Sequence, residues 1–352
     1  MKILVIQQKM IGDVLISSLI CENIKRNFPD AEVHYLINAF TKPVVDGNPF
    51  IDKFVIFEDL YRESKPAFYT FLKSIRQENY THVIDAYGKL ESNLISLFSK
   101  APYKASYHKN YTSWIYTKTY KEMSEPLTEA GIAIDYRLKL LETLGNLKIY
   151  NSKPQIYLST QEKEAAAMAF QKHSLDAQKT IMINALGSGL NKTYPLAYMA
   201  EVIDTIASET RSSLIFNYMP KQKDEVQKLY NLCAPETQKR IHLEFTANSL
   251  RNLMAISSQC QAIIGNEGGA INIAKALDVP SFAIFSPWIF KEGWNSFEKN
   301  YPNASVHLSD YKPELCKDSK SELKHKSLQL YQEFKPDFFK TKLSEFMTNH
   351  II

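Results

Sequence analysis

The sequence predicts an α/β protein made of two parallel sheets, each with helices on both faces. Short apolar runs rich in β-branched residues recur along the chain and alternate with stretches of helical periodicity. This alternation runs through the first hundred residues and starts again near residue 179. The 352 residues are enough for two domains, and with 45% of them hydrophobic, both can bury a core.

The first half begins with the apolar run KILVI, which is typical of a buried strand. The helix after it is expected to end at Pro29-Asp30, because proline cannot continue a helix. Strands are predicted in this half at 2–6, 31–37, 53–57 and 81–85, and later helices near 66–78, 91–99 and 128–144.

Residues 101–121 interrupt the pattern with six aromatic residues and several basic ones, and no acidic residue lies among them. Aromatic rings pack on sugars and lie at membrane interfaces, while lysines contact anionic lipids or phosphates. Lys104 and Lys109 are therefore candidate acceptor-binding residues. A tyrosine-rich covering of the first sheet explains the stretch equally well.

The second half repeats the alternation after a connector at residues 150–178. Strands are predicted at 180–185, 213–217, 241–245, 261–265 and 281–285, with helices at 195–209, 221–232, 248–258 and 270–277. The lysine-rich residues 311–327 are expected to form a surface segment, and a last helix near 336–348 follows Pro336.

Composition narrows the class of protein. A net charge of +4 is too weak to indicate nucleic-acid binding, and 23% charged residues is usual for a globular protein. The four cysteines are scattered without metal or redox spacing, which favours a reducing compartment. Charges interrupt the N-terminal apolar run, and no apolar run approaches the ~20 residues of a membrane span, so we expect a cytoplasmic protein.

The chemistry is expected in the loops that follow strands, because open α/β sheets bind ligands at the carboxyl ends of their strands. The first such loop, residues 7–13, ends in Gly12-Asp13. Asp13 is either a helix N-cap or a general base that deprotonates an acceptor hydroxyl.

The second loop, residues 187–195, carries Gly187, Ser188, Gly189 and Lys192 before Pro195. Glycines free backbone N–H groups to face an anion, and the lysine adds a charge suited to a diphosphate. The third loop contains Glu267-Gly268-Gly269 at the start of a helix. Either loop alone is equally explained as a flexible or tight turn, but the two together favour a nucleotide-diphosphate site.

Together these segments resemble glycosyltransferase family 9, the ADP-heptose:lipopolysaccharide heptosyltransferases. The resemblance rests on the opening MKILVIQQKMIGDVLISSLI, on GSGLNKTYPLAYMAEVI and on IIGNEGGAINIAKALDVPSFAIFSP. It implies a GT-B fold, in which two Rossmann-like domains face each other across a cleft, and an inverting transfer that needs no metal and no cofactor. The expected boundaries are an acceptor domain at 1–165, a donor domain at 166–335, and a C-terminal helix at 336–352 that packs back on the N-terminal domain.

The resemblance also implies roles for individual residues. Asp13 would be the catalytic base and Lys192 would stabilise the departing diphosphate. The donor would be bound by loops two and three, and the acceptor by residues of loop one and of the segment 101–121. The donor set is Gly187, Ser188, Gly189, Glu267, Gly268, Gly269 and Asn272, and the acceptor set is Gly12, Lys9, Lys104 and Lys109.

Two positions depart from the family pattern, which usually has aspartate at 267 and histidine at 272; here they are Glu267 and Asn272. These changes leave the donor sugar open, although ADP-heptose is expected. The implied partners are a nucleotide-sugar donor, an anionic glycolipid or lipopolysaccharide-core acceptor and the cytoplasmic face of the inner membrane as a peripheral contact, without nucleic acid. Two alternatives stay open: a GT-B-fold sugar-nucleotide epimerase, and a non-catalytic protein that binds sugar nucleotides or glycolipids.

Overall fold

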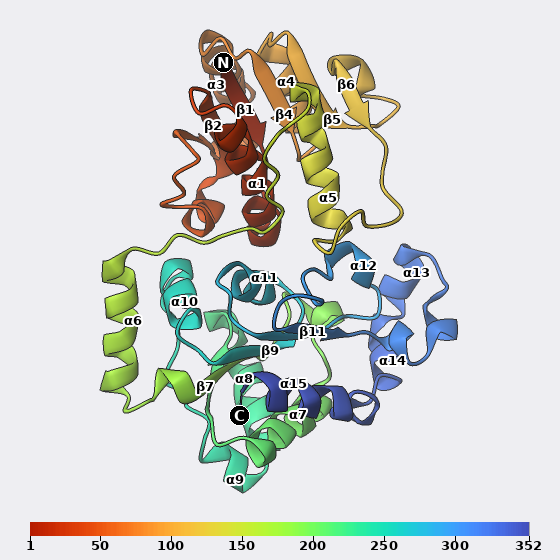
Figure 1. The fold of residues 1–352 in the computed structure, drawn as a ribbon. Coiled ribbons are helices and arrows are strands. Elements are labelled where there is room, and N and C mark those ends of the chain that lie inside the picture. Colours follow the sequence, from red (N-terminus) through yellow and green to blue (C-terminus); the bar gives the residue numbers. More distant parts are fainter. Residues whose placement is uncertain (352) are drawn as a thin grey trace. The chain divides into compact units, whose positions relative to one another are not determined.

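The computed structural model describes residues 1–351 and divides into two compact units, Met1–Tyr157 and Leu158–Ile352. Each unit is built around one parallel sheet with helices on both faces (Figure 1). None of the helices within residues 1–351 combines the length and apolarity needed to cross a membrane.

The first unit contains a six-stranded sheet with the order β3-β2-β1-β4-β5-β6. Its strands are β1 (Lys2–Ile6), β2 (Glu32–Asn38), β3 (Lys53–Phe57), β4 (His82–Asp85), β5 (Tyr103–Tyr107) and β6 (Lys118–Tyr120). Its main helices are α1 (Ile11–Asn27), α2 (Leu60–Glu63), α3 (Lys65–Gln77), α4 (Leu90–Phe98) and α5 (Ile132–Leu138).

Side chains alternate along these strands, so each face of the first sheet needs its own cover. Leu4 and Ile6 of β1 belong to a core shared with α3 and α4, which includes Phe71 and Ile95. Helices α1 and α5 pack together and cover the other face (Figure 1). The sheet is thus buried on both sides, as the apolar strand sequences predict.

The second unit contains a five-stranded sheet with the order β11-β10-β9-β7-β8. Its strands are β7 (Thr180–Asn184), β8 (Ser213–Asn217), β9 (Ala262–Asn266), β10 (Ser281–Ile284) and β11 (Asn303–Val306). Its main helices are α6 (Thr160–Lys172), α7 (Leu196–Glu209), α8 (Lys223–Leu232), α10 (Leu250–Ser257), α11 (Gly269–Ala276) and α15 (Lys340–His350). Shorter helices are α9 (Pro235–Gln238), α12 (Lys291–Trp294), α13 (Lys320–His325) and α14 (Ser327–Gln332).

Two apolar cores lie on opposite faces of the second sheet. Ile181 and Ile183 of β7 contribute to the core beneath α7, α8 and α15. Met182, between them, contributes to the core with α6, α10 and α11. The two-residue period of the strand therefore divides one apolar run between two layers of helices.

The domain boundaries predicted from the sequence need correction. The division falls after Tyr157 and not after 165, because all of α6 belongs to the second unit: Ala166 and Phe170 are buried there, and Glu162 pairs with Arg251 of α10 at 2.5 Å. The C-terminal helix α15 packs against α7 in the core of the second unit, and not on the N-terminal domain as expected.

Most strand predictions are confirmed within one residue, but 241–245 is not a strand. Its apolar residues alternate with polar ones, yet only Ile241 forms a bridge, to Leu214 of β8. Conversely, β5 and β6 lie in the stretch rich in tyrosine and lysine, whose composition hid the strand pattern. Tyr116 and Tyr120 are buried in this stretch, whereas Tyr111 and Trp114 are 72% and 71% exposed.

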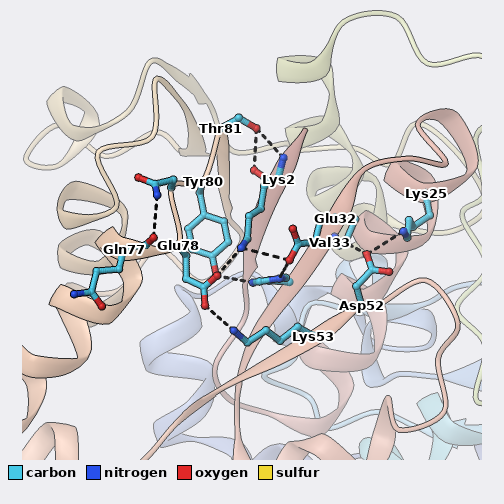
Figure 2. Close-up of polar contacts among 12 residues, drawn as sticks. Lys2, Lys25, Glu32, Val33, Asp52, Lys53, Gln77, Glu78, Tyr80 and Thr81 are labelled. Carbon is cyan, nitrogen blue, oxygen red and sulfur yellow. Dashed lines mark hydrogen bonds and ion pairs between the residues drawn. The ribbon is translucent and has the colours of Figure 1, made fainter.

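A network of charged side chains joins the amino ends of four strands in the first unit (Figure 2). The Glu78 carboxylate accepts from Lys2 at 2.5 Å and from Lys53 at 2.6 Å, and these hydrogen bonds lower the pKa of Glu78 to about 2. His34 of β2 links Glu32 at 2.7 Å to the Tyr80 hydroxyl at 2.8 Å. The network connects β1, β2, β3 and the segment before β4 at the amino ends of the strands.

This network predicts a pH-dependent contribution to stability. The folded pKa of Glu78 lies below its ordinary value of 4.5, so its contribution is complete above pH 4.5 and is lost as pH falls towards 2. We expect Glu78→Gln to lower the free energy of unfolding by about 1 kcal/mol at pH 7, measured by urea denaturation. The deficit should shrink at pH 3, whereas the exposed Glu125→Gln should show none at either pH; a deficit that does not change with pH would contradict this role.

Candidate functional site

In each sheet the direction in which successive strands are added reverses at one point. Such reversal points are where ligands bind in open α/β sheets. In the first unit the reversal lies between β1 and β4, and in the second between β7 and β9. Loop one follows β1, loop two follows β7 and loop three follows β9. All three loops predicted from the sequence therefore lie at reversal points.

Asp13 lies in the first turn of α1 and is held by a buried arginine. One of its carboxylate oxygens, Oδ1, accepts a hydrogen bond from the guanidinium of Arg137 on α5. Arg137 also donates to Ser17 Oγ at 2.8 Å and to the Ala133 carbonyl at 2.7 Å. The Asp13 side chain is 21% exposed, and within residues 1–351 its second oxygen has no hydrogen-bond partner. Arg137 thus fixes the carboxylate and leaves one oxygen available.

The alternative role for Asp13 as a helix cap is wrong. The N-cap of α1 is Met10, which makes no side-chain cap bond. Met10 has φ 67°, a conformation that costs a non-glycine residue about 1–3 kcal/mol and occurs preferentially at functional sites. The buried Gln8 fixes the loop by accepting from Arg62 at 3.1 Å through its side chain and from the Asn38 N–H at 3.0 Å through its carbonyl.

Tyr107, at the end of β5, is a site residue that the sequence analysis did not single out. Its hydroxyl is buried without a hydrogen-bond partner in the part of the chain that the structure describes. Burial raises the pKa of this phenol, and the charges of Arg137 and Asp13 also act on it. Tyr107 therefore stays neutral and can donate a hydrogen bond beside Asp13. The aromatic stretch 101–121 was the only signal for it in the sequence.

The predicted acceptor residues do not all lie at the same ends of the strands. Gly12 and Lys9 precede Asp13 in loop one, which follows the carboxyl end of β1. Lys109 lies at the same ends of the strands, because its Nζ donates to the Gly88 carbonyl, after β4, at 2.5 Å. Lys104 does not belong with them. It pairs with Val83 near the amino end of β4, and burial lowers the pKa of its ammonium. The prediction for Lys104 is wrong, because this residue lies near the amino end of β5, whereas loop one lies at the carboxyl ends of the strands.

Asparagines are the last residues of three neighbouring strands of the second unit, and their hydrogen bonds hold loop two in place. The buried Asn266 amide accepts from the Tyr194 N–H at 2.7 Å and donates to the carbonyls of Asn184 and Ala185 at 3.0 and 2.9 Å. Asn217 donates to Asn184 Oδ1 at 2.9 Å. These bonds tie the start and the end of loop two to the strand that leads into loop three.

Loop two folds tightly on Gly187. A Cβ at this position would lie 2.1 Å from the Lys192 carbonyl oxygen, so only glycine fits. The Gly187 N–H donates to Thr193 Oγ1 at 3.1 Å, and its carbonyl accepts from Gln222 at 2.9 Å. Ser188 and Gly189 are exposed at the tip of the loop, where their N–H groups can face an anion.

Loop three carries a carboxylate without a partner. Glu267 Oε2 is buried and accepts no hydrogen bond from the described residues. Burial raises the pKa of Glu267, and the positive charges of Lys192 and Lys275 act against that rise. A buried acceptor that lacks a donor is costly, and sugar hydroxyls are suitable donors. The structure thus brings Lys192 and Glu267 of the predicted donor set close together.

The remaining donor residues lie at the start of α11. Gly268 is its N-cap, with φ 155°, and Gly269 is its first residue. Asn272 follows within the first turn, where its N–H donates to the Gly268 carbonyl at 3.2 Å. Lys275, which the sequence analysis did not select, is buried on the same helix and donates to Ser296 Oγ at 3.3 Å. Burial lowers the pKa of Lys275 to about 8.

Known proteins resemble this chain over most of its length. Residues 68–325 match the family described as Glycosyltransferase family 9 (heptosyltransferase). Lipopolysaccharide heptosyltransferase 1 of Campylobacter coli is 25% identical over 81% of this chain and 84% of its own. A family 9 glycosyltransferase from Veillonella parvula has a TM-score of 0.73 at 18% identity, covering 94% of this chain and 97% of that one. An Escherichia coli heptosyltransferase solved with ADP has a TM-score of 0.65 at 15% identity, covering 87% and 93%. These neighbours share the GT-B fold.

The tight turn of loop two predicts a difference between two glycine substitutions. Gly187→Ala forces the backbone of Lys192 to move and should lower the free energy of unfolding by about 1–3 kcal/mol. Gly189→Ala is the matched control, because its nearest contact, Asn191 Oδ1 at 3.6 Å, is an ordinary one. Urea denaturation of both variants checks this. Equal stabilities would show that loop two is not held in this conformation.

Proposed function

The chain belongs to glycosyltransferase family 9, and on this premise we propose that it transfers a heptose from ADP-heptose to the core of a lipopolysaccharide or a related glycolipid. The proposed acceptor and donor sugar follow the family description and the heptosyltransferase relatives. The observation that best supports a nucleotide-sugar donor is the conjunction of Lys192 with the unpartnered carboxylate of Glu267 at the reversal point of the second sheet.

The donor would bind with its diphosphate along loop two. Negative charge on the diphosphate grows as the bond to the sugar C1 breaks. The Lys192 ammonium, the loop N–H groups and the start of α11 supply positive charge there. This arrangement supports transfer without a metal or another cofactor, because the Lys192 ammonium stabilises the growing phosphate charge by electrostatic attraction and hydrogen bonding. Glu267 would accept from a hydroxyl of the ribose or the sugar.

The acceptor hydroxyl would be activated by Asp13. The free carboxylate oxygen takes the hydroxyl proton, the acceptor oxygen attacks C1 and the nucleoside diphosphate leaves, which inverts the anomeric centre. Arg137 orients Asp13 through the other oxygen, and the neutral Tyr107 hydroxyl can donate to the acceptor. Gly12, Lys9 and Lys109 are the remaining candidates for acceptor contacts.

A peripheral contact with the cytoplasmic face of the inner membrane is a further part of the proposal. It is supported by Tyr111 and Trp114, whose rings are 72% and 71% exposed beside Lys109 in sequence. Exposed tyrosine and tryptophan rings are suited to the polar boundary of a bilayer. A glycolipid acceptor would be presented at this boundary.

The family match favours transfer over an epimerase, and a turnover assay decides between transfer and binding alone. We expect Asp13→Asn to lower kcat by about 10²–10⁴-fold, because the amide cannot take a proton although it can still accept from Arg137. Donor affinity, measured by calorimetry, should stay within about twofold. The exposed Asp30→Asn is the control. Unchanged turnover in Asp13→Asn would reject the base, and a wild-type chain that binds donor without turnover would favour the binding protein.

The donor site predicts a pattern of thermal stabilisation. A ligand that binds only the folded state raises the melting temperature with its occupancy, so a panel of ADP, UDP, GDP and their sugars identifies the nucleotide. Lys192→Ala should weaken the preferred diphosphate about tenfold or more, because a charge-assisted hydrogen bond is lost. Lys179→Ala, at the opposite end of β7, should bind like the wild type. Equal affinity in Lys192→Ala and wild type contradicts the assignment.

A further inference from the structure

The lysine-rich segment 311–327 has no role in the function proposed above, yet the structure brings part of it beside loop two. Lys320 and Lys324 lie one turn apart on α13. Their Nζ atoms lie over the Trp288 ring, 5.9 and 5.3 Å from its centroid. The Lys192 Nζ lies 5.5 Å from the same centroid. Three ammonium groups from two distant segments thus gather around one indole ring.

Trp288 is itself fastened to loop two. Its Nε1–H donates to the Asn191 carbonyl at 2.8 Å, and Ser286 Oγ donates to the same oxygen at 2.6 Å. Asn191 directly precedes Lys192, and α14 packs against the short helix that contains both residues, Leu190–Lys192. The ring is therefore a fixed platform beside the proposed diphosphate site, and the lysines over it share that position.

The three ammonium groups lack matched countercharges among residues 1–351, where none of them forms an ion pair. Two carboxylates of the same segment are engaged elsewhere: Asp318 pairs with Lys326 at 2.7 Å, and Glu322 accepts from the Ser319 N–H at 3.0 Å. Glu267 is close enough to Lys192 for their charges to interact, but it is not bonded to it. Like charges held close together repel, and a bound anion removes that repulsion. The aromatic face stabilises the ammonium groups until the anion arrives.

We propose that Lys320 and Lys324, held on Trp288 beside Lys192, are further binding residues for the diphosphate of the donor. The inference rests on the proposed function, because it takes Lys192 as the diphosphate-binding lysine. Three converging cations match the charge of a leaving nucleoside diphosphate better than one does, and their stabilisation increases as that charge develops. The lysine-rich segment then belongs to the donor site as a clamp that contacts the phosphates and no part of the base.

Calorimetry with the full chain tests the clamp, with ADP, AMP and inorganic pyrophosphate as probes. We expect Lys320→Ala/Lys324→Ala to weaken ADP and pyrophosphate about tenfold or more, and AMP less, since AMP lacks the second phosphate. The loss should diminish at high salt, because the lysines are exposed and their charges are screened. Lys326→Ala, from the same segment but paired with Asp318, is the matched control and should bind ADP like the wild type.

The outcomes distinguish a failure of this inference from a failure of the proposed function. If Lys192→Ala loses ADP affinity while the double variant keeps it, the clamp is refuted and the donor site stands. If the wild-type chain binds none of ADP, UDP and GDP, the proposed function fails and the clamp with it. A double variant that changes only the KM for the acceptor would assign these lysines to an anionic group of the acceptor, and would also overturn the clamp.

Two substitutions of Trp288 isolate the aromatic platform. Trp288→Phe and Trp288→Leu both lose the hydrogen bond to Asn191, but only phenylalanine keeps an aromatic face. We expect the double lysine substitution to weaken ADP binding strongly in the Phe background and little in the Leu background. Equal effects in both backgrounds would show that Trp288 does not position the lysines. Circular dichroism melting curves for each protein confirm that the variants are folded.

Discussion

The arrangement of loops two and three, where we propose that the donor binds, depends on one buried amide. Asn266 is fully buried and uses its side chain as acceptor and donor at once, towards the Tyr194 N–H and the carbonyls of Asn184 and Ala185. Without it, three buried backbone groups would lose their partners, each at a cost of about 1–3 kcal/mol. An aspartate lacks the donors and a leucine lacks both functions. The position of Lys192 relative to Glu267, and hence the anion site, follows from this amide.

Local sequence patterns were sufficient to predict the two parallel sheets and the loops that carry the chemistry. Strand and helix periods are encoded within a few residues, and glycines mark where loops two and three must turn. The partners of these loops are encoded far away. Arg137 contacts Asp13 across 124 residues, and Lys320 lies over Trp288 although the two are far apart in sequence. No periodicity reports such contacts, so Arg137, Tyr107 and Trp288 could not be selected from the sequence, and Lys104 was selected on composition alone.

The contact between Asp13 and Arg137 has a physical consequence for the proposed base. The guanidinium holds one carboxylate oxygen in a fixed direction, which favours a productive approach to a hydroxyl. In the proposed reaction the neutral phenol of Tyr107 adds to this, since a hydrogen bond to the acceptor oxygen stabilises the charge that develops there.

The two units differ in how their charges are balanced. In the first, Asp13 already has Arg137 as a countercharge. In the second, Glu267 is buried without a donor and three ammonium groups crowd Trp288 without an ion pair among the described residues. Unbalanced charge lowers the stability of a folded protein unless a ligand supplies the missing partner. A ligand with hydroxyls at one end and a diphosphate at the other supplies both a donor for Glu267 and a countercharge for the ammonium groups. We therefore assign donor binding to the second unit in the proposed function.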